Sequence, residues 1–96
     1  MRSRGGLAPS LLIHGTGISV ALRYDPADAP VPIVVGINTQ SAAVRALRAA
    51  SEAATPVFED TRLALDLAAS VGLGKRVRER HFTPIARLLA QARLIG

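Results

Sequence analysis

Cysteine is absent from this 96-residue chain, which excludes disulfide frameworks, cysteine zinc ribbons, thiol catalysis and redox switching. Aromatic residues make up only 3% of the chain and tryptophan is missing, so few rings could stack on nucleic-acid bases. Long apolar runs are also lacking, because Pro9, His14, Gly15 and Gly17 interrupt the first one, and a spanning helix needs about 18 apolar residues. We therefore expect neither a membrane span nor a cleaved secretory signal in this chain.

Acidic residues are outnumbered, with seven Asp and Glu against twelve Lys and Arg, for a net charge of +5. This balance favours acidic partners such as nucleic acid, an anionic lipid surface or a carboxylate-rich protein face. The densest basic segment is KRVRER at residues 75–80, and a charge run of this kind is usually a solvated face. A small basic binding domain for nucleic acid or anionic surfaces is therefore the alternative interpretation, and the shortage of aromatics argues against nucleic acid.

What the chain does have is apolar content, at 49% with a mean hydropathy of +0.28. That content predicts a globular chain, and the length predicts a single hydrophobic core. The first residues are basic and rich in glycine. We therefore divide the chain into a flexible basic N-terminal tail, residues 1–9, and one domain, residues 10–96.

Two apolar runs, residues 10–13 and 18–24, are separated by His-Gly-Thr-Gly. Two glycines within four residues are a strong turn signal, so we predict two strands joined by an exposed turn over positions 14–17. Alternation in the second strand places Ile18, Val20 and Leu22 on a packed face, with the residues between them on a half-exposed face.

The stretch at residues 25–32 holds three prolines and predicts a loop. A continuous apolar run at residues 33–36 then predicts a short strand buried on both faces. A helical period follows, capped by Asn38 or Thr39 and running to about Ala54. Its inward stripe is predicted to comprise Ala43, Val44, Leu47, Ala50 and Ala54.

Three further elements are predicted: a brief strand at residues 57–59, a helix at residues 61–71, and a last helix from Pro84, capped by Thr83, to about Leu94. The fold class expected from this order is α/β. It should be a small single domain with about four short strands and helices packed around the sheet.

Catalytic and metal-binding motifs are weak throughout. His14 beside glycines suggests the oxyanion loop of a hydrolase, but no G-x-S-x-G elbow accompanies it. Residues 72–76, GLGKR, lack the first glycine and the Ser or Thr of a phosphate loop. His14 and His81 lie in different predicted elements without ligand spacing. We therefore predict no catalytic residue, no metal and no cofactor.

The string ISVALRYDPADAPVPIVVG, residues 18–36, resembles the cytoplasmic C-terminal domain of the FlhB/YscU family, the export-apparatus switch proteins of bacterial flagella and type III secretion systems. The family pattern is Asn-Pro-Thr-His, an apolar strand ending in Leu-Arg-Tyr, an acidic proline loop, and Pro-Ile-Val-Val. Residues 20–24 and 32–35 match it residue by residue. The similarity continues without a gap from about Ser10 to Ala92.

The departure from the family pattern falls on its Asn-Pro-Thr-His motif, which aligns with His14, Gly15, Thr16 and Gly17. In the family, the asparagine is understood to attack its own backbone carbonyl through its side-chain amide and to cut the chain before the proline. Histidine has no carboxamide, and only Thr16 matches the motif. The resemblance therefore implies the family fold, but it predicts that autocleavage is lost and that the chain is not an enzyme.

The resemblance further implies a docking or substrate-specificity module of a flagellar or type III protein export apparatus. Its expected partners are gate components, secretion substrates or a ruler protein, and its expected location is cytoplasmic, at the inner membrane face through those partners. The family's membrane half is missing from this sequence, so we expect a stand-alone relative or an excised fragment. The predicted partner-binding residues adjoin the turn and are Arg23, Tyr24, Asp25 and Pro26.

Overall fold

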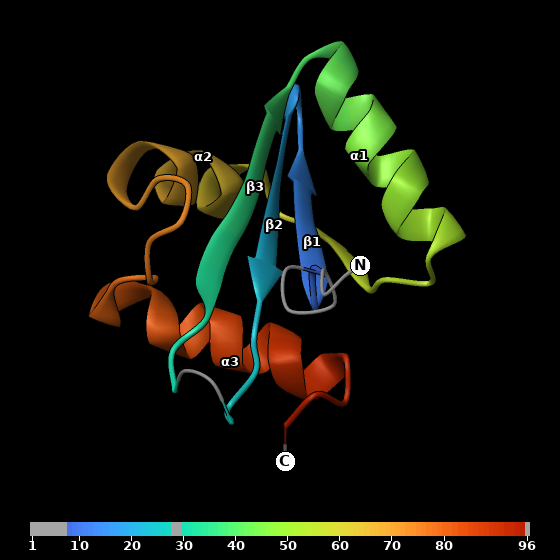
Figure 1. Cartoon of the computed structure of the whole chain (residues 1–96). Helices are drawn as coiled ribbons and strands as arrows, with labels where there is room; N and C mark the ends of the chain where they lie inside the picture. The colour runs from blue at the N-terminus through green and yellow to red at the C-terminus, as the bar shows by residue number, and fades with distance from the viewer. Residues whose placement is uncertain (1–7, 28–29, 96) are drawn as a thin grey trace.

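The computed structural model describes residues 8–27 and 30–95. Of the predicted tail, only Ala8 and Pro9 are among the described residues, and the rest of that prediction lies outside them. A four-stranded mixed sheet in the order β3-β2-β1-β4 forms the centre of the domain. Helices pack on both of its faces (Figure 1). The predicted α/β class and the predicted order of elements are confirmed.

The strands are β1 (Leu11–Gly15), β2 (Ile18–Arg23), β3 (Ile33–Thr39) and β4 (Val57–Glu59). The helices are α1 (Ser41–Glu52), α2 (Thr61–Ser70), the short 3-10 helix η2 (Glu79–His81) and α3 (Phe82–Gln91). Strand β1 pairs antiparallel with β2 and parallel with β4. None of the helices formed by the described residues is long and apolar enough to cross a membrane.

The main core lies between the sheet and the pair α2 and α3. The face of β2 predicted to pack does so, since Ile18, Val20 and Leu22 are all buried there. Leu11 and Ile13 of β1 lie on the same face, because the antiparallel register sets them opposite Leu22 and Val20. The helices contribute Leu63, Leu67, Ile85 and Leu89 to this cluster.

The opposite face of β2 was predicted to be half exposed, and this is wrong for Ser19 and Ala21, which are both buried. Helix α1 covers this face and forms a second, smaller core in which Leu12, Ala21 and Ala50 meet. The alternation of β2 alone could not reveal this, because the covering helix lies twenty residues further along the chain.

Strand β3 was predicted to be short and buried on both faces, and it is neither. It runs through Thr39 at the edge of the sheet and is mostly half-buried. Part of its outer edge is closed by the basic segment, because Val34 N–H donates to the Lys75 carbonyl at 2.9 Å and Val77 N–H donates to the Pro32 carbonyl at 3.0 Å. Val77 is thereby drawn into the core.

Helix boundaries differ from the predictions for local reasons. Because Asn38 and Thr39 belong to β3, α1 starts at Ser41, and Gln40 rather than either predicted residue is its N-cap. Val44, predicted to face inward, is exposed. Helix α3 begins at Phe82, so Pro84 lies within its first turn, where a missing N–H removes no intrahelical hydrogen bond.

His81 ties α3 to α2. Its Nδ1 accepts the Arg78 backbone N–H at 3.2 Å, so Nε2 carries the proton and donates to Asp66 Oδ2 at 2.6 Å. Arg80 forms an ion pair with the other Asp66 oxygen at 3.0 Å. The hydrogen bonds from Arg80 and then His81 lower the pKa of Asp66 from 3.8 to about 2. His81 is thus a buried side chain with hydrogen bonds at both ring nitrogens.

Replacing Leu22 by alanine should lower the free energy of unfolding by about 2 to 5 kcal/mol, because the side chain is fully buried between the sheet and its helices. Urea denaturation followed by circular dichroism measures this change. Leu65→Ala is the matched control, since Leu65 is 52% exposed on α2. Equal effects of the two substitutions would contradict the assigned core.

Replacing Asp66 by asparagine should lower stability at neutral pH, and the difference from the unmodified chain should shrink with acid. A carboxyl group whose folded pKa is depressed stabilises the fold above its ordinary value, here 3.8, and this contribution is lost as the pH falls towards about 2. Denaturation curves between pH 7 and pH 2 measure it. Glu79→Gln on η2 is the control, and a stability gap independent of pH would contradict the ion-pair assignment.

Candidate functional site

The β1–β2 hairpin holds the four positions aligned with the cleavage motif. Only Thr16 and Gly17 form the loop, and Gly17 alone of the two has a positive φ, +72°, as the third residue of a type II turn requires. His14 and Gly15 belong to β1, where Gly15 is buried and His14 is half-buried. The prediction of an exposed turn over all four positions is therefore wrong at its first two residues.

A glycine is required at position 15 because β1 lies close to the backbone of Thr61, and not because the chain turns there. A Cβ atom added to it would lie 2.5 Å from Thr61 Cα, which is backbone and cannot rotate away. Beside it, the Thr16 backbone N–H donates to Thr61 Oγ1 at 2.9 Å. The hairpin is thus held directly against the first residue of α2.

His14 is engaged within the sheet. Its Nδ1 lies 2.7 Å from Ser19 Oγ, and the single hydroxyl proton of Ser19 is donated to the Ala43 carbonyl at 3.2 Å. Nδ1 of His14 must therefore carry the proton that Ser19 Oγ accepts. The His14 carbonyl in turn accepts the Asp60 backbone N–H at 2.9 Å. These hydrogen bonds of His14 link β1 to β2 and to the N-cap of α2, and Ser19 continues the connection to α1.

A shallow polar groove surrounds the hairpin. Its walls include His14, Thr16, Gln40, Glu59 and Thr61. Gln40 has φ +53°, an uncommon value for a residue with a side chain, and its N–H donates to the Gly17 carbonyl at 3.0 Å. Among the described residues, no three His, Asp or Glu side chains gather closely enough to hold a metal ion.

The predicted partner-binding residues do not adjoin the turn of the hairpin. Five residues of β2, Ile18–Leu22, separate Arg23 from that turn, which at about 3.3 Å per residue amounts to about 17 Å. In Figure 1 the hairpin lies at the top of the sheet near the start of α1, and the chain leaves β2 at the bottom, above α3. The sequence prediction that these residues adjoin the turn is therefore wrong, and their role in partner binding stays a prediction.

Arg23 and Asp25 are paired in this lower region. Arg23 Nη2 lies 3.2 Å from Asp25 Oδ2, and the Arg23 side chain is only 13% exposed. Asp25 Oδ1 also accepts the Ala27 backbone N–H at 3.1 Å, which fixes the turn after Pro26. Tyr24 is held by its backbone, since its N–H donates to Ser10 Oγ at 2.8 Å.

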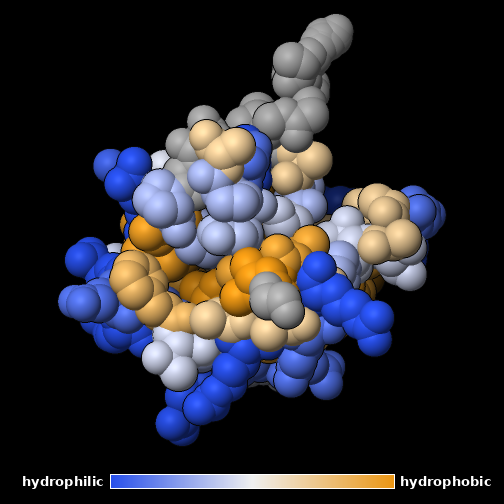
Figure 2. Space-filling view, turned by 90° about the horizontal axis from the view of Figure 1, so that it is seen from below, coloured by the Kyte–Doolittle hydropathy of each residue, from blue (hydrophilic) through white to orange (hydrophobic). Residues whose placement is uncertain are grey.

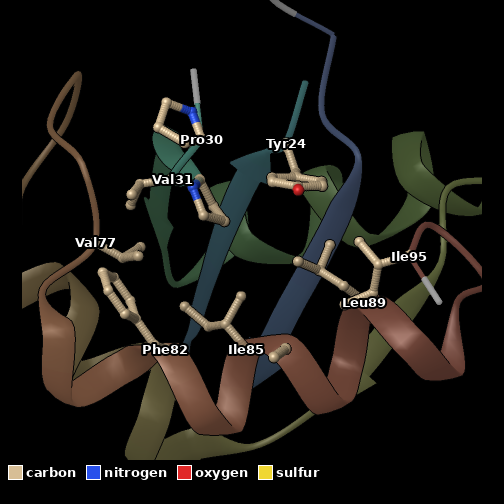
Figure 3. A pocket seen from close by; sticks show the side chains of 10 residues that line it. Tyr24, Pro30, Val31, Val77, Phe82, Ile85, Leu89 and Ile95 are labelled. Atoms are coloured by element: carbon tan, nitrogen blue, oxygen red, sulfur yellow. The ribbon is translucent and has the colours of Figure 1, made fainter. Parts of the chain in front are cut away.

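An apolar groove opens beside Tyr24. Figure 2 shows apolar side chains gathered in a hollow on the lower face of the molecule, with hydrophilic side chains around it. In Figure 3, Phe82, Ile85 and Leu89 of α3 point towards Tyr24 and Val31 across the hollow. The groove is lined by Tyr24, Pro30, Val31, Pro32, Val77, Phe82, Ile85, Ala86, Leu89 and Ile95.

The groove was not predicted from the sequence, because its walls come from four separate segments. One signal was available: Phe82, Ile85 and Leu89 follow each other at helical spacing and form one apolar stripe. The predicted start of the last helix at Pro84 left Phe82 outside that stripe. Of the predicted partner-binding residues, only Tyr24 lines the groove.

Comparison with known proteins agrees with this architecture. Residues 10–92 match the model of the FlhB HrpN YscU SpaS family. The chain is 35% identical over 74 residues to the secretion system apparatus protein SsaU of Salmonella typhimurium, covering 77% of this chain and 21% of SsaU. It is 33% identical over 85 residues to the probable translocation protein y4yO of Sinorhizobium fredii, covering 88% of this chain and 25% of that protein. The chain thus spans about a quarter or less of these relatives.

Solved structures give the same result. The EscU C-terminal domain with an asparagine-to-aspartate mutation superposes with a TM-score of 0.86 at 26% identity, covering 92% of this chain and 83% of that one. The cytoplasmic domain of FlhB from Shewanella putrefaciens has the same fold, with a TM-score of 0.84 at 21% identity over 90% of this chain and 67% of that one. Because the family model covers nearly the whole described domain, the chain belongs to the FlhB HrpN YscU SpaS family.

Proposed function

We propose that this chain is a non-cleaving docking module of a flagellar or type III protein export apparatus. In this proposal the apolar groove takes an apolar segment of a protein partner, which is a gate component, a secretion substrate or a ruler protein. The proposed location is the cytoplasm, at the inner membrane face through those partners. The observation that carries the proposal is the groove itself, which is concave, apolar and open to solvent.

The composition of the groove suits protein recognition. Its floor is rigid, because Val77, Ile85 and Leu89 are buried members of the main core. Phe82, which lines one side of the groove, is 42% exposed and offers an aromatic surface for a partner to cover. Apolar and aromatic anchors inside a polar rim are the usual source of binding energy at protein interfaces.

In this proposal, the predicted partner-binding residues beside Tyr24 form a charged rim of the apolar groove. Arg23 and Asp25 are the chain neighbours of Tyr24, and Pro26 comes next, so they lie at the edge of the groove that Tyr24 lines. The Arg23–Asp25 ion pair holds that edge in place. We propose that these residues position Tyr24 and the loop after β2 for the partner.

The hairpin geometry supports the absence of cleavage. The bond between His14 and Gly15 lies within β1, with the His14 carbonyl occupied by the Asp60 N–H. No side-chain amide is attached at position 14 to attack that carbonyl. A proline at position 15 would bring its own Cβ against Thr61 Cα. The missing side-chain amide at position 14 therefore favours an intact chain.

The purified chain should keep its full mass for days at neutral pH, because position 14 lacks the nucleophile that succinimide closure requires. Mass spectrometry of samples taken over time measures this. A parallel sample unfolded in urea controls for cleavage by contaminating proteases, which would act faster on the unfolded chain. Two fragments separated between His14 and Gly15 in the folded sample would contradict the prediction.

Replacing Phe82 by alanine should weaken binding to purified export-gate cytoplasmic domains, ruler protein or secretion substrate by about tenfold or more, as expected for an aromatic anchor. Isothermal titration calorimetry measures the affinity. Leu65→Ala removes a similarly exposed apolar side chain from α2 and should leave binding unchanged.

A second control separates groove binding from charge. The double substitution Arg76→Glu and Arg78→Glu alters the basic segment outside the apolar walls and should change the affinity of a groove-bound partner by less than Phe82→Ala does. A greater loss from the charge substitutions would instead support the alternative of a basic binding domain. No binding of the unmodified chain to any of the three partner classes would contradict the docking function.

A further inference from the structure

The turn after α2 presents an uncovered leucine. Leu73 is 63% exposed, more than any other large hydrophobic side chain among the described residues. It stands between Gly72 and Gly74, whose φ angles are +88° and +81°. A Cβ atom on either glycine would have no neighbour within 4 Å, so the turn projects into open space.

The backbone of this turn is nevertheless fixed. Gly72 N–H donates to the Leu67 carbonyl at 3.2 Å and closes the end of α2. Gly74 N–H donates to the Val34 carbonyl at 2.7 Å and joins the turn to the edge of β3. The projecting leucine is thus held at one place on the surface, instead of moving with a loose loop.

Cations follow the leucine after one glycine, Gly74. Lys75, Arg76 and Arg78 are exposed, while Val77 between them is buried and anchors the segment. Because side chains alternate along an extended segment, Arg76 and Arg78 share the side opposite Val77. Arg78 Nε donates to the Ser70 carbonyl at 2.8 Å, which holds this guanidinium close to the C-terminus of α2.

Little negative charge offsets these cations. Between residues 67 and 81 the sequence has one acidic residue, Glu79, against four Lys and Arg. The nearest preceding acid, Asp66, is already engaged by Arg80 and His81. We name residues 72–78 the basic turn, and its outer surface combines one apolar side chain with three cations.

We propose that the basic turn docks on an anionic membrane surface, with Leu73 entering the lipid and Lys75, Arg76 and Arg78 contacting lipid phosphates. An exposed leucine gains free energy only in an apolar medium, which a bilayer supplies and a nucleic-acid backbone does not. Cations beside it gain from the negative surface potential of such membranes. The segment also carries no aromatic ring that could stack on bases.

The expected attachment is reversible. A single leucine contributes a small insertion free energy, and the electrostatic attraction is screened by salt. Membrane binding therefore requires both the leucine and the cations of the basic turn. This contact uses a surface separate from the apolar walls of the groove, apart from the buried anchor Val77, so it does not depend on the proposed function.

Flotation with vesicles tests the electrostatic part. The unmodified chain should bind vesicles of phosphatidylcholine with about 30 mol % phosphatidylglycerol and should fail to bind pure phosphatidylcholine. Each cation near such a surface contributes about fivefold in affinity, so Arg76→Glu with Arg78→Glu should reduce binding about 25-fold or more. Arg45→Glu with Arg48→Glu on α1 makes the same charge change elsewhere and should have a clearly smaller effect.

Fluorescence tests the apolar part, because the chain has no tryptophan of its own. The emission of a Leu73→Trp variant should shift to the blue on anionic vesicles, and that of a Leu65→Trp variant should not. Leu73→Ser should reduce flotation several-fold, whereas Leu65→Ser should leave it unchanged. Circular dichroism confirms that each variant is folded.

Four results would overturn the proposal. The first is failure of the unmodified chain to float with anionic vesicles even at low salt. The second is equal loss in the α1 and basic-turn charge variants, which would show that net charge alone drives binding. The third is an unshifted emission from the Leu73→Trp variant on anionic vesicles. The fourth is tight binding to a DNA duplex that competes with vesicles and does not change in the Leu73→Ser variant.

Discussion

Strand β1 is hydrogen-bonded along both edges and covered on both faces, and the other layers of the domain are arranged around it. Its alternate residues contribute to two different cores, Leu11 and Ile13 to one and Leu12 to the other. Its last residue, Gly15, fits only because it lacks a side chain against Thr61. The position of α2, and through His81 and Asp66 that of α3, therefore follows from the end of this one strand.

The local pattern of apolar and polar residues predicted most of the strands and helices. It did not predict which helix packs on which face of the sheet. Alternation correctly assigned Ile18, Val20 and Leu22 to a packed face. It could not assign Ser19 and Ala21, since their burial depends on α1, which packs from a distant part of the sequence. In the same way, the apolar run at the start of β3 indicated a strand but not its place at the sheet edge.

In the candidate site, too, local features could be predicted from the sequence and features that depend on distant contacts could not. Gly17 has the positive φ that a glycine beside a turn suggests, whereas Gly15 serves a contact with a residue forty-six positions away. The groove is formed by side chains from the loop after β2, from Val77, from α3 and from Ile95 beyond it, and no single window of the sequence contains them. Such a surface can be identified only in the folded structure, although the apolar stripe of Phe82, Ile85 and Leu89 indicates one of its walls from the sequence.

The parallel pairing of β1 with β4 has a consequence for the order of folding. The β1–β2 hairpin joins neighbouring residues and can close early, but Leu12 meets Val57 only across a long intervening stretch that includes β3 and α1. During synthesis, the second edge of the central strand therefore stays open until β4 has left the ribosome. For that interval the nascent chain exposes an apolar strand edge to pairing with other chains. The open edge of β1 is covered only when the three residues of β4, Val57–Glu59, pair with it.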